Sequence, residues 1–141
     1  MDHKFMRNIT AVFRCAAMYR EEKLSKSGLN GYQAQYVPEI CKHPGITQDQ
    51  LAQRLHVNRS NVTRQLAALE ENGFITRSRC GDDKRAIEVF PTEKMLEIFP
   101  EVRKVFKSWR EELTKGISEE EMVVIERALA TLAQRAEDIS K

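Results

Sequence analysis

Hydrophobic positions recur every three or four residues in long segments near both ends of the chain. This spacing predicts long amphipathic helices over residues 2–26 and on both sides of Gly116. In the last helix the hydrophobic residues alternate steps of three and four, as in helices that pack side by side. They are Met122, Ile125, Leu129, Leu132, Ala136 and Ile139.

A shorter helical segment follows the first long helix. Asn30 and Gln33 have the spacing of a capping box, which predicts a helix start. Pro38 lies inside this segment, and we expect it to kink or interrupt the helix because proline lacks an amide hydrogen.

The middle of the chain predicts two helices joined by a tight turn. Thr47 and Gln50 have capping-box spacing at the start of the first helix, and Asn58 is the next favourable N-cap. The buried stripe of the second helix, 59–71, is expected to consist of Val62, Leu66 and Leu69, with Ala67 beside them.

Two strands are predicted after the second helix. Gly73 suits the left-handed position that ends a helix. Residues 74–79 alternate Phe, Thr and Ser with Ile, Arg and Arg, as the two faces of a strand do, and residues 86–90 alternate again beyond a charged tip at 80–85. This arrangement predicts a two-stranded hairpin. The predicted fold class is therefore mainly α with a small β-hairpin wing: a winged helix-turn-helix domain plus long terminal helices.

The exposed side of the second helix carries short hydrogen-bonding side chains and guanidinium groups, without a carboxylate. This exposed stripe consists of Arg59, Ser60, Asn61, Thr63, Arg64 and Gln65. Such side chains bind base edges and phosphates in a major groove. The alternative is an ordinary solvated face, which usually mixes both signs of charge. The lack of carboxylates favours double-stranded DNA as a partner.

Composition limits the possible function classes. A length of 141 residues suits a single domain, and a net charge of +2 does not by itself indicate a nucleic-acid partner. No continuous apolar run marks a signal peptide or a membrane span, so we expect a cytoplasmic protein. Three widely spaced cysteines and three isolated histidines give neither a disulfide framework nor a metal site, and no cofactor is expected.

Three stretches resemble the MarR family of bacterial transcriptional regulators: residues 69–75 (LEENGFI), 83–86 (DKRA) and 89–94 (VFPTEK). The resemblance covers essentially the whole chain, and the Asp-x-Arg pattern of the wing carries most of its weight. It implies a nucleoid-associated repressor that binds a pseudo-palindromic operator as a homodimer and is released by a small-molecule effector. Residues 1–29 and 92–141 would then form dimerisation helices, and residues 30–91 the DNA-binding lobe.

In the family, the wing aspartate orients the wing arginine, which enters the minor groove. Asp83 and Arg85 correspond to this pair, and Lys84 is expected to contact phosphate. A surface ion pair that stabilises the turn is the alternative for Asp83 and Arg85, and both roles are compatible. The expected DNA-binding residues are Thr47, Gln48, Asn58, Arg59, Ser60, Asn61, Thr63, Arg64, Gln65, Arg77, Asp83, Lys84 and Arg85.

The expected dimer interface consists of hydrophobic residues on the three long helices: Phe5, Ile9, Val12, Trp109, Leu113, Met122, Ile125, Leu129, Leu132 and Ile139. Packing of the last helix against the preceding one within a single chain is the alternative, and periodicity does not distinguish the two. Three long helices offer more apolar surface than one small winged domain can cover, which favours the homodimer.

A small aromatic or phenolic effector is expected to bind among Phe13, Cys15, Tyr19, Tyr32 and Tyr36, although core packing explains the same residues. The family's peroxide-sensing branch carries a reactive cysteine early in a corresponding helix, close to tyrosines of the next one. Cys15 lies near the middle of the first helix, and a similar role for it would have Tyr32 and Tyr36 as the neighbouring tyrosines. The alternative for Cys15 is a small buried apolar side chain.

Two other function classes fit the sequence less well than a DNA-binding regulator does. No nucleophile elbow, phosphate-binding glycine loop or carboxylate pair is present, so the chain is not expected to be an enzyme. A winged helix used only for protein contacts would have an apolar or acidic second helix, and the polar exposed stripe argues against it.

Overall fold

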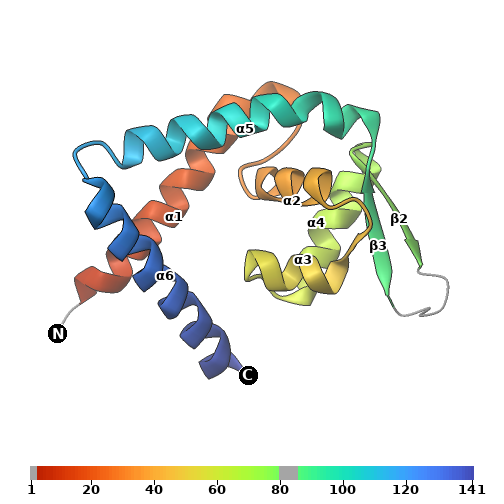
Figure 1. Ribbon diagram of the computed structural model, residues 1–141. Coiled ribbons are helices and arrows are strands. Elements are labelled where there is room, and N and C mark those ends of the chain that lie inside the picture. Colours follow the sequence, from red (N-terminus) through yellow and green to blue (C-terminus); the bar gives the residue numbers. More distant parts are fainter. Residues whose placement is uncertain (1–2, 80–85) are drawn as a thin grey trace. The chain divides into compact units, whose positions relative to one another are not determined.

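The computed structural model describes residues 3–79 and 86–141 (Figure 1). The α-helices are α1 (His3–Leu24), α2 (Tyr36–Lys42), α3 (Gln48–Leu55), α4 (Arg59–Glu71), α5 (Glu93–Leu113) and α6 (Glu119–Ser140). Two 3₁₀ helices, η1 (Ser25–Ser27) and η2 (Gln33–Gln35), precede α2. The strands are β1 (Ile46–Thr47), β2 (Ile75–Arg79) and β3 (Ile87–Pro91). The chain divides into two compact units, of which the first ends at Trp109 and the second comprises Arg110–Lys141.

The strands form a three-stranded antiparallel sheet in the order β1-β3-β2. The predicted hairpin of β2 and β3 is confirmed, with Arg77 opposite Val89. A third strand, which the sequence did not predict, completes the sheet, because Ile46 of β1 also pairs with Val89 from the other side of β3. A strand of two residues is too short to produce an alternating pattern, and the adjacent Thr47 is also a helix cap.

The two helices of the helix-turn-helix begin at the predicted residues. The Thr47 hydroxyl accepts a hydrogen bond from the Gln50 amide, and the Gln50 side chain accepts one from the Thr47 amide, which completes the capping box. The Asn58 side chain caps α4 by accepting from the Asn61 amide. His56, in the turn between α3 and α4, has a left-handed φ of 55°. These local bonds fix where the exposed face of α4 begins.

The core of the first unit lies under the buried stripe of α4. Val62, Leu66 and Leu69 are fully buried, as the sequence predicts. Ala67 is exposed rather than buried, and Ala68 is half-buried instead. A rotation of about 100° per residue carries position 67 off the stripe on the side that faces solvent.

The connection between α1 and α2 is irregular. Asn30 and Gln33 form the predicted reciprocal capping bonds, but the helix that follows is first η2 and then α2. Pro38 does not kink α2: it lies in the first turn, where an amide hydrogen has no partner within the helix. In the same connection, Gly31 lies so close to α1 that a β-carbon on it would be 1.9 Å from the carbonyl oxygen of Ala17.

The long helices after the sheet differ in burial. In α5, Met95, Val102 and Val105 are buried, and the helix continues through Pro100. A capping box between Ser118 and Glu121 begins α6. No residue of α6 is buried within the single chain.

Candidate nucleic-acid interface

The exposed stripe of α4 presents its predicted side chains to solvent. Arg59, Ser60, Thr63 and Arg64 are exposed, while Asn61 and Gln65 are half-buried. A carboxylate that the sequence pattern did not place there is nevertheless near, because Asp49 of α3 forms an ion pair with Arg59 at 3.2 Å. Both of these side chains are more than half exposed, so this pair contributes little to stability and can exchange for a phosphate.

A hydrogen-bond network joins the sheet to both helices of the motif. Arg77 on β2 donates to the carboxylate of Glu70 near the end of α4 and to the side-chain oxygen of Gln48 at the start of α3. The Gln48 amide in turn donates to the hydroxyl of Thr63 on α4, at 3.4 Å. Of the expected DNA-binding residues, Gln48, Thr63 and Arg77 thus lie together, with Glu70 as a partner that the sequence did not reveal.

A hollow of about 410 Å³ lies behind the exposed stripe. Phe13 of α1 and Tyr32 line it with a ring-centroid distance of 5.8 Å, and Tyr36 of α2 lines it too. Asn61 and Gln65 reach it from α4. The hydroxyl of Tyr36 is buried and has no hydrogen-bond partner in the described part of the chain, and burial raises its pKa. Three of the five predicted effector residues therefore lie together, next to the helix that carries the stripe.

The other two predicted effector residues line a different hollow, of about 670 Å³. Cys15 and Tyr19 lie there with Trp109, whose ring is 5.2 Å from that of Tyr19. Cys15 is exposed, in contrast to the buried thiol considered as an alternative. Burial raises the pKa of Cys41 to about 11, so Cys41 remains a protonated thiol near neutral pH.

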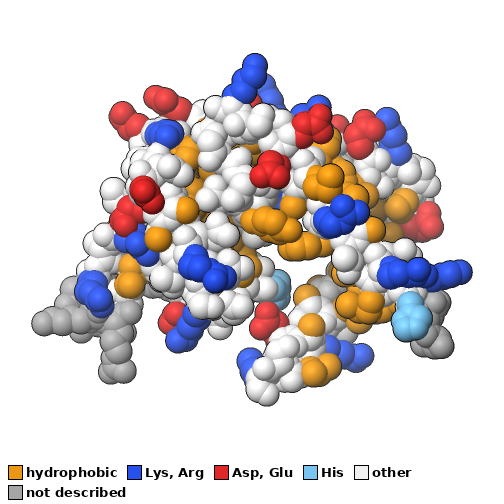
Figure 2. Space-filling view, turned by 180° about the vertical axis from the view of Figure 1, so that it is seen from behind, with side chains coloured by type: hydrophobic (Ala, Val, Ile, Leu, Met, Phe, Trp, Pro, Cys, Tyr) orange, Lys and Arg blue, Asp and Glu red, His pale blue; other side chains and the backbone are white. Residues whose placement is uncertain are grey.

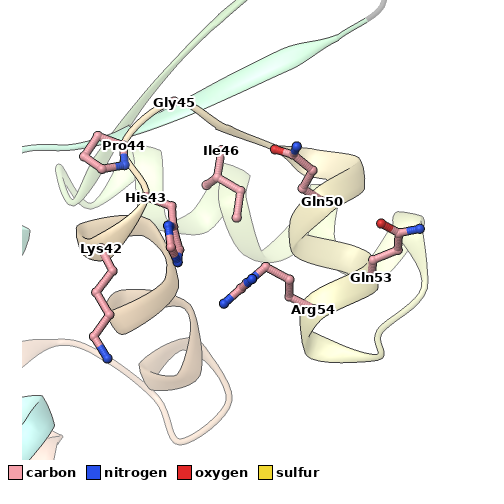
Figure 3. Close-up of a pocket in the computed structure, with 8 residues that line it drawn as sticks. All are labelled: Lys42, His43, Pro44, Gly45, Ile46, Gln50, Gln53 and Arg54. Atoms are coloured by element: carbon pink, nitrogen blue, oxygen red, sulfur yellow. The ribbon is translucent and has the colours of Figure 1, made fainter. Parts of the chain in front are cut away.

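A third hollow, of about 660 Å³, separates the end of α2 from α3 (Figure 3). His43 and Arg54 extend into it from the two sides, and Gln50 and Gln53 line it from α3. Glu39 forms an ion pair with Arg54 and so neutralises the positive charge that Arg54 brings to this hollow. This hollow lies on the side of α3 away from Gln48, which faces α4.

Most residues of the expected dimer interface are exposed in the single chain, where hydrophobic side chains reach the surface among charged ones (Figure 2). The exposed ones are Phe5, Ile9, Val12, Leu113, Ile125, Leu129, Leu132 and Ile139, and Trp109 and Met122 are half-buried. Ile139 is 83% exposed and Phe5 is 53% exposed.

The wing tip lies outside the described residues, and with it the expected contacts of Asp83, Lys84 and Arg85. Among the residues that the structure describes, no cluster of His, Cys, Asp or Glu could hold a metal ion. No helix in those same residues is long and apolar enough to cross a membrane.

Comparison with known proteins agrees with this geometry. The model of the MarR family matches residues 33–87. A relative from Bacillus subtilis (strain 168), the uncharacterized HTH-type transcriptional regulator YybA, is 30% identical over 102 residues, which is 72% of this chain and 68% of the relative.

Solved structures share the fold over nearly the whole chain. A MarR protein from Peptoclostridium difficile has a TM-score of 0.91 at 22% identity, covering 98% of this chain and 90% of its own. A MarR family transcriptional regulator from Listeria monocytogenes, complexed with 26mer DNA, has a TM-score of 0.88 at 26% identity, covering 94% of this chain and 89% of its own. This chain therefore belongs to the MarR family, whose members are transcriptional regulators and not enzymes.

Proposed function

We propose that the protein is a repressor that binds a pseudo-palindromic operator as a homodimer and is released by a small-molecule effector. The observation that carries the DNA-binding part is the exposed stripe of α4, which begins at the Asn58 cap and presents donors and acceptors without a carboxylate of its own. The Listeria relative of the same fold is complexed with DNA, which supports the same partner here.

In this proposal α4 enters the major groove and the wing contacts the flanking minor groove. Arg64 reaches a base edge or a phosphate. Thr47 and Gln48 lie at the start of α3, where their hydroxyl and amide groups can bind the phosphate backbone of the DNA. Lys84 contacts phosphate and Arg85, oriented by Asp83, enters the minor groove. Residues 30–91 act as the DNA-binding lobe, and residues 1–29 and 92–141 as dimerisation helices.

Operator binding can be tested by selecting DNA fragments from the genomic region around the protein's own gene in a gel shift. In a nuclease footprint of the shifted fragment, a dimer is expected to protect two half-sites whose centres lie roughly 34 Å apart, about one turn of the DNA helix. A footprint confined to one half-site contradicts the dimeric arrangement. If no fragment shifts at low salt, DNA binding itself is wrong.

Arg64→Ala is expected to weaken binding to the selected operator by about 1 to 3 kcal/mol, because it removes a guanidinium from the exposed stripe. Discrimination at one base pair per half-site should be relaxed as well. Titrations against single base-pair variants of the operator measure both effects. Arg103→Ala, which removes an exposed arginine from α5, serves as the control and should bind as the wild type does.

The effector is proposed to bind in the hollow between α1, α2 and α4. Its lining contains the aromatic rings of Phe13, Tyr32 and Tyr36, the side-chain amides of Asn61 and Gln65 and the imidazole of His56, but no Lys, Arg, Asp or Glu. A neutral phenolic compound suits this lining better than an aromatic carboxylate, because a carboxylate buried without a permanently charged cation is costly. A ligand here would contact α4 directly and could displace the exposed stripe from its DNA-binding position.

Tyr36→Phe is expected to have opposite effects on stability and on effector binding. It removes a buried hydroxyl without a described partner, so the free energy of unfolding should rise by about 1 kcal/mol. In this proposal the effector opens the hollow to the buried Tyr36 hydroxyl, so affinity for a phenolic effector should fall in the variant, which cannot form that hydrogen bond. Calorimetric titration with phenol and benzoate measures the second effect. Tyr19→Phe, in the other hollow, should leave effector binding unchanged.

Oxidation of Cys15 is the second candidate for release, supported by the exposure of its sulfur. The gel shift is repeated with peroxide on the wild type and on Cys15→Ser. Loss of a peroxide response in the variant establishes the thiol as the sensor. A wild type that keeps binding in peroxide but is released by a phenolic compound supports the ligand mechanism.

A further inference from the structure

We propose that Arg77 is a positioning residue that sets which hydrogen-bonding groups Gln48 and Thr63 present to DNA, and does not itself contact DNA. This inference rests on the proposed function, because it concerns how the exposed stripe of α4 reads a base pair. It reverses the expectation from the sequence, in which Arg77 is one of the DNA-contacting cations.

The Arg77 guanidinium is already bound to two side chains. Its Nε and Nη2 donate to Oε1 of Glu70 at 3.4 and 3.1 Å, and its Nη1 donates to Oε1 of Gln48 at 3.1 Å. Its backbone amide donates to the other oxygen of the Glu70 carboxylate. The Arg77 side chain is only 21% exposed, whereas that of Arg59 on the stripe is 79% exposed. A phosphate would have to displace a carboxylate that is held by both side chain and backbone.

Arg77 fixes the orientation of the Gln48 side-chain amide. A guanidinium can only donate hydrogen bonds, so the group of Gln48 that faces Arg77 must be the oxygen. The amide nitrogen of Gln48 is therefore turned to the Thr63 hydroxyl, to which it donates at 3.4 Å. Without Arg77, the Gln48 amide could rotate and present its oxygen to Thr63 instead.

The hydroxyl of Thr63 takes part in two hydrogen bonds within the protein. Its single proton is donated to the backbone carbonyl of Arg59 at 3.0 Å, and it accepts from Gln48. Only an acceptor lone pair and the methyl group of Thr63 are then free. In the major groove an acceptor can bind the amino group of adenine or cytosine, and a methyl group packs on the methyl of thymine. The relay from Arg77 through Gln48 thus makes Thr63 an acceptor.

The experiment uses the full-length protein and operators selected from a random DNA pool. Thr63→Val, which keeps the shape but removes the hydroxyl, first identifies the base pair that this position discriminates. Arg77→Ala and Gln48→Met should each reduce discrimination at that same pair by about tenfold. The double variant should be no worse than either single one, because both changes break one relay. The salt dependence of Arg77→Ala should equal that of the wild type.

Arg59→Ala is the matched control, because Arg59 is an exposed arginine on α4, the helix that carries Thr63, and its ion pair with Asp49 can exchange for a phosphate. Its loss should lower the slope of log affinity against log salt by about one. If Arg77→Ala lowers the slope in the same way and keeps discrimination, Arg77 binds phosphate and the proposal is wrong. Additive effects of Arg77→Ala and Gln48→Met also overturn it. Thermal unfolding of each variant shows whether a loss reflects a damaged fold.

A measurement without DNA separates this proposal from the proposed function. In the free protein, Arg77→Lys should shift the NMR resonances of the Gln48 side-chain amide, because lysine cannot bond Glu70 and Gln48 together in the geometry of a guanidinium. Unchanged Gln48 resonances disprove the relay even if the wild type binds DNA. A wild type that selects no DNA sequence, with shifted Gln48 resonances, disproves DNA reading and leaves the contact itself supported.

Discussion

A protein that carries both Leu129→Glu and Leu132→Glu is expected to be monomeric and to lose operator binding. Both leucines belong to the hydrophobic stripe of α6 in which residues alternate steps of three and four. Leu129 is 51% exposed and Leu132 is 38% exposed in the single chain. Burial of a leucine in an interface is worth about 1.5–3 kcal/mol, and a glutamate there must also lose its hydration. Because two linked half-sites bind about 10²–10⁴ times more tightly than one, loss of the dimer should reduce operator affinity severely.

Light scattering at micromolar concentration measures the oligomeric state of this variant, and a gel shift measures its DNA binding. The matched control is Thr131→Glu with Gln134→Glu, which adds the same charge to the other side of α6, where both side chains are exposed. This control should remain dimeric. The proposed interface is contradicted if the wild type is itself monomeric, or if the variant with Leu129→Glu and Leu132→Glu remains dimeric.

The parts of the fold that the sequence predicted correctly depend on short-range geometry. The Thr47 and Asn58 caps bond to amides within three residues, so a sequence pattern contains both partners. The buried stripe of α4 follows from helical spacing alone. The positions of these elements could therefore be read from the sequence to within a residue or two.

The features that the sequence did not reveal depend on residues far apart in the chain. Strand β1 exists because Ile46 pairs with Val89, and the Arg77 network joins residues 29 positions apart. An alternating or helical pattern contains no information about such pairs. A basic residue on the strand next to α4 therefore leads the sequence to predict a DNA contact, and the structure adds that the Arg77 guanidinium is bound to Glu70.

The predicted effector residues lie in two separate hollows because of helical geometry, which can be calculated from the sequence. Positions 13 and 15 of one helix differ by about 200° in direction, so Phe13 and Cys15 cannot face the same hollow. The structure places Phe13 beside Tyr32 and places Cys15 beside Tyr19 and Trp109. Similar residue type grouped these side chains in the sequence, and helical geometry divides them.

Gly31→Ala is expected to destabilise the protein more than any other single methyl addition considered for its glycines. The added β-carbon would lie 1.9 Å from the carbonyl oxygen of Ala17 and 2.7 Å from its carbonyl carbon, which are backbone atoms of α1 and cannot rotate away. The connection must then move off α1, which breaks the bond from Arg20 Nε to the Gly31 carbonyl at 2.8 Å. We expect the free energy of unfolding to fall by about 3 kcal/mol or more.

The control for this prediction is Gly28→Ala, a glycine in the same connection with a φ of +87° and no atom within 4 Å of an added β-carbon. It should cost only the strain of a left-handed alanine, about 1–2 kcal/mol. Urea denaturation at one protein concentration compares the two variants, because the stability of a dimer depends on concentration. Since Gly31 precedes Tyr32, its displacement should also separate Tyr32 from Phe13 and weaken binding of a phenolic effector. Equal destabilisation by the two substitutions would show that the close approach of Gly31 to α1 does not exist in solution.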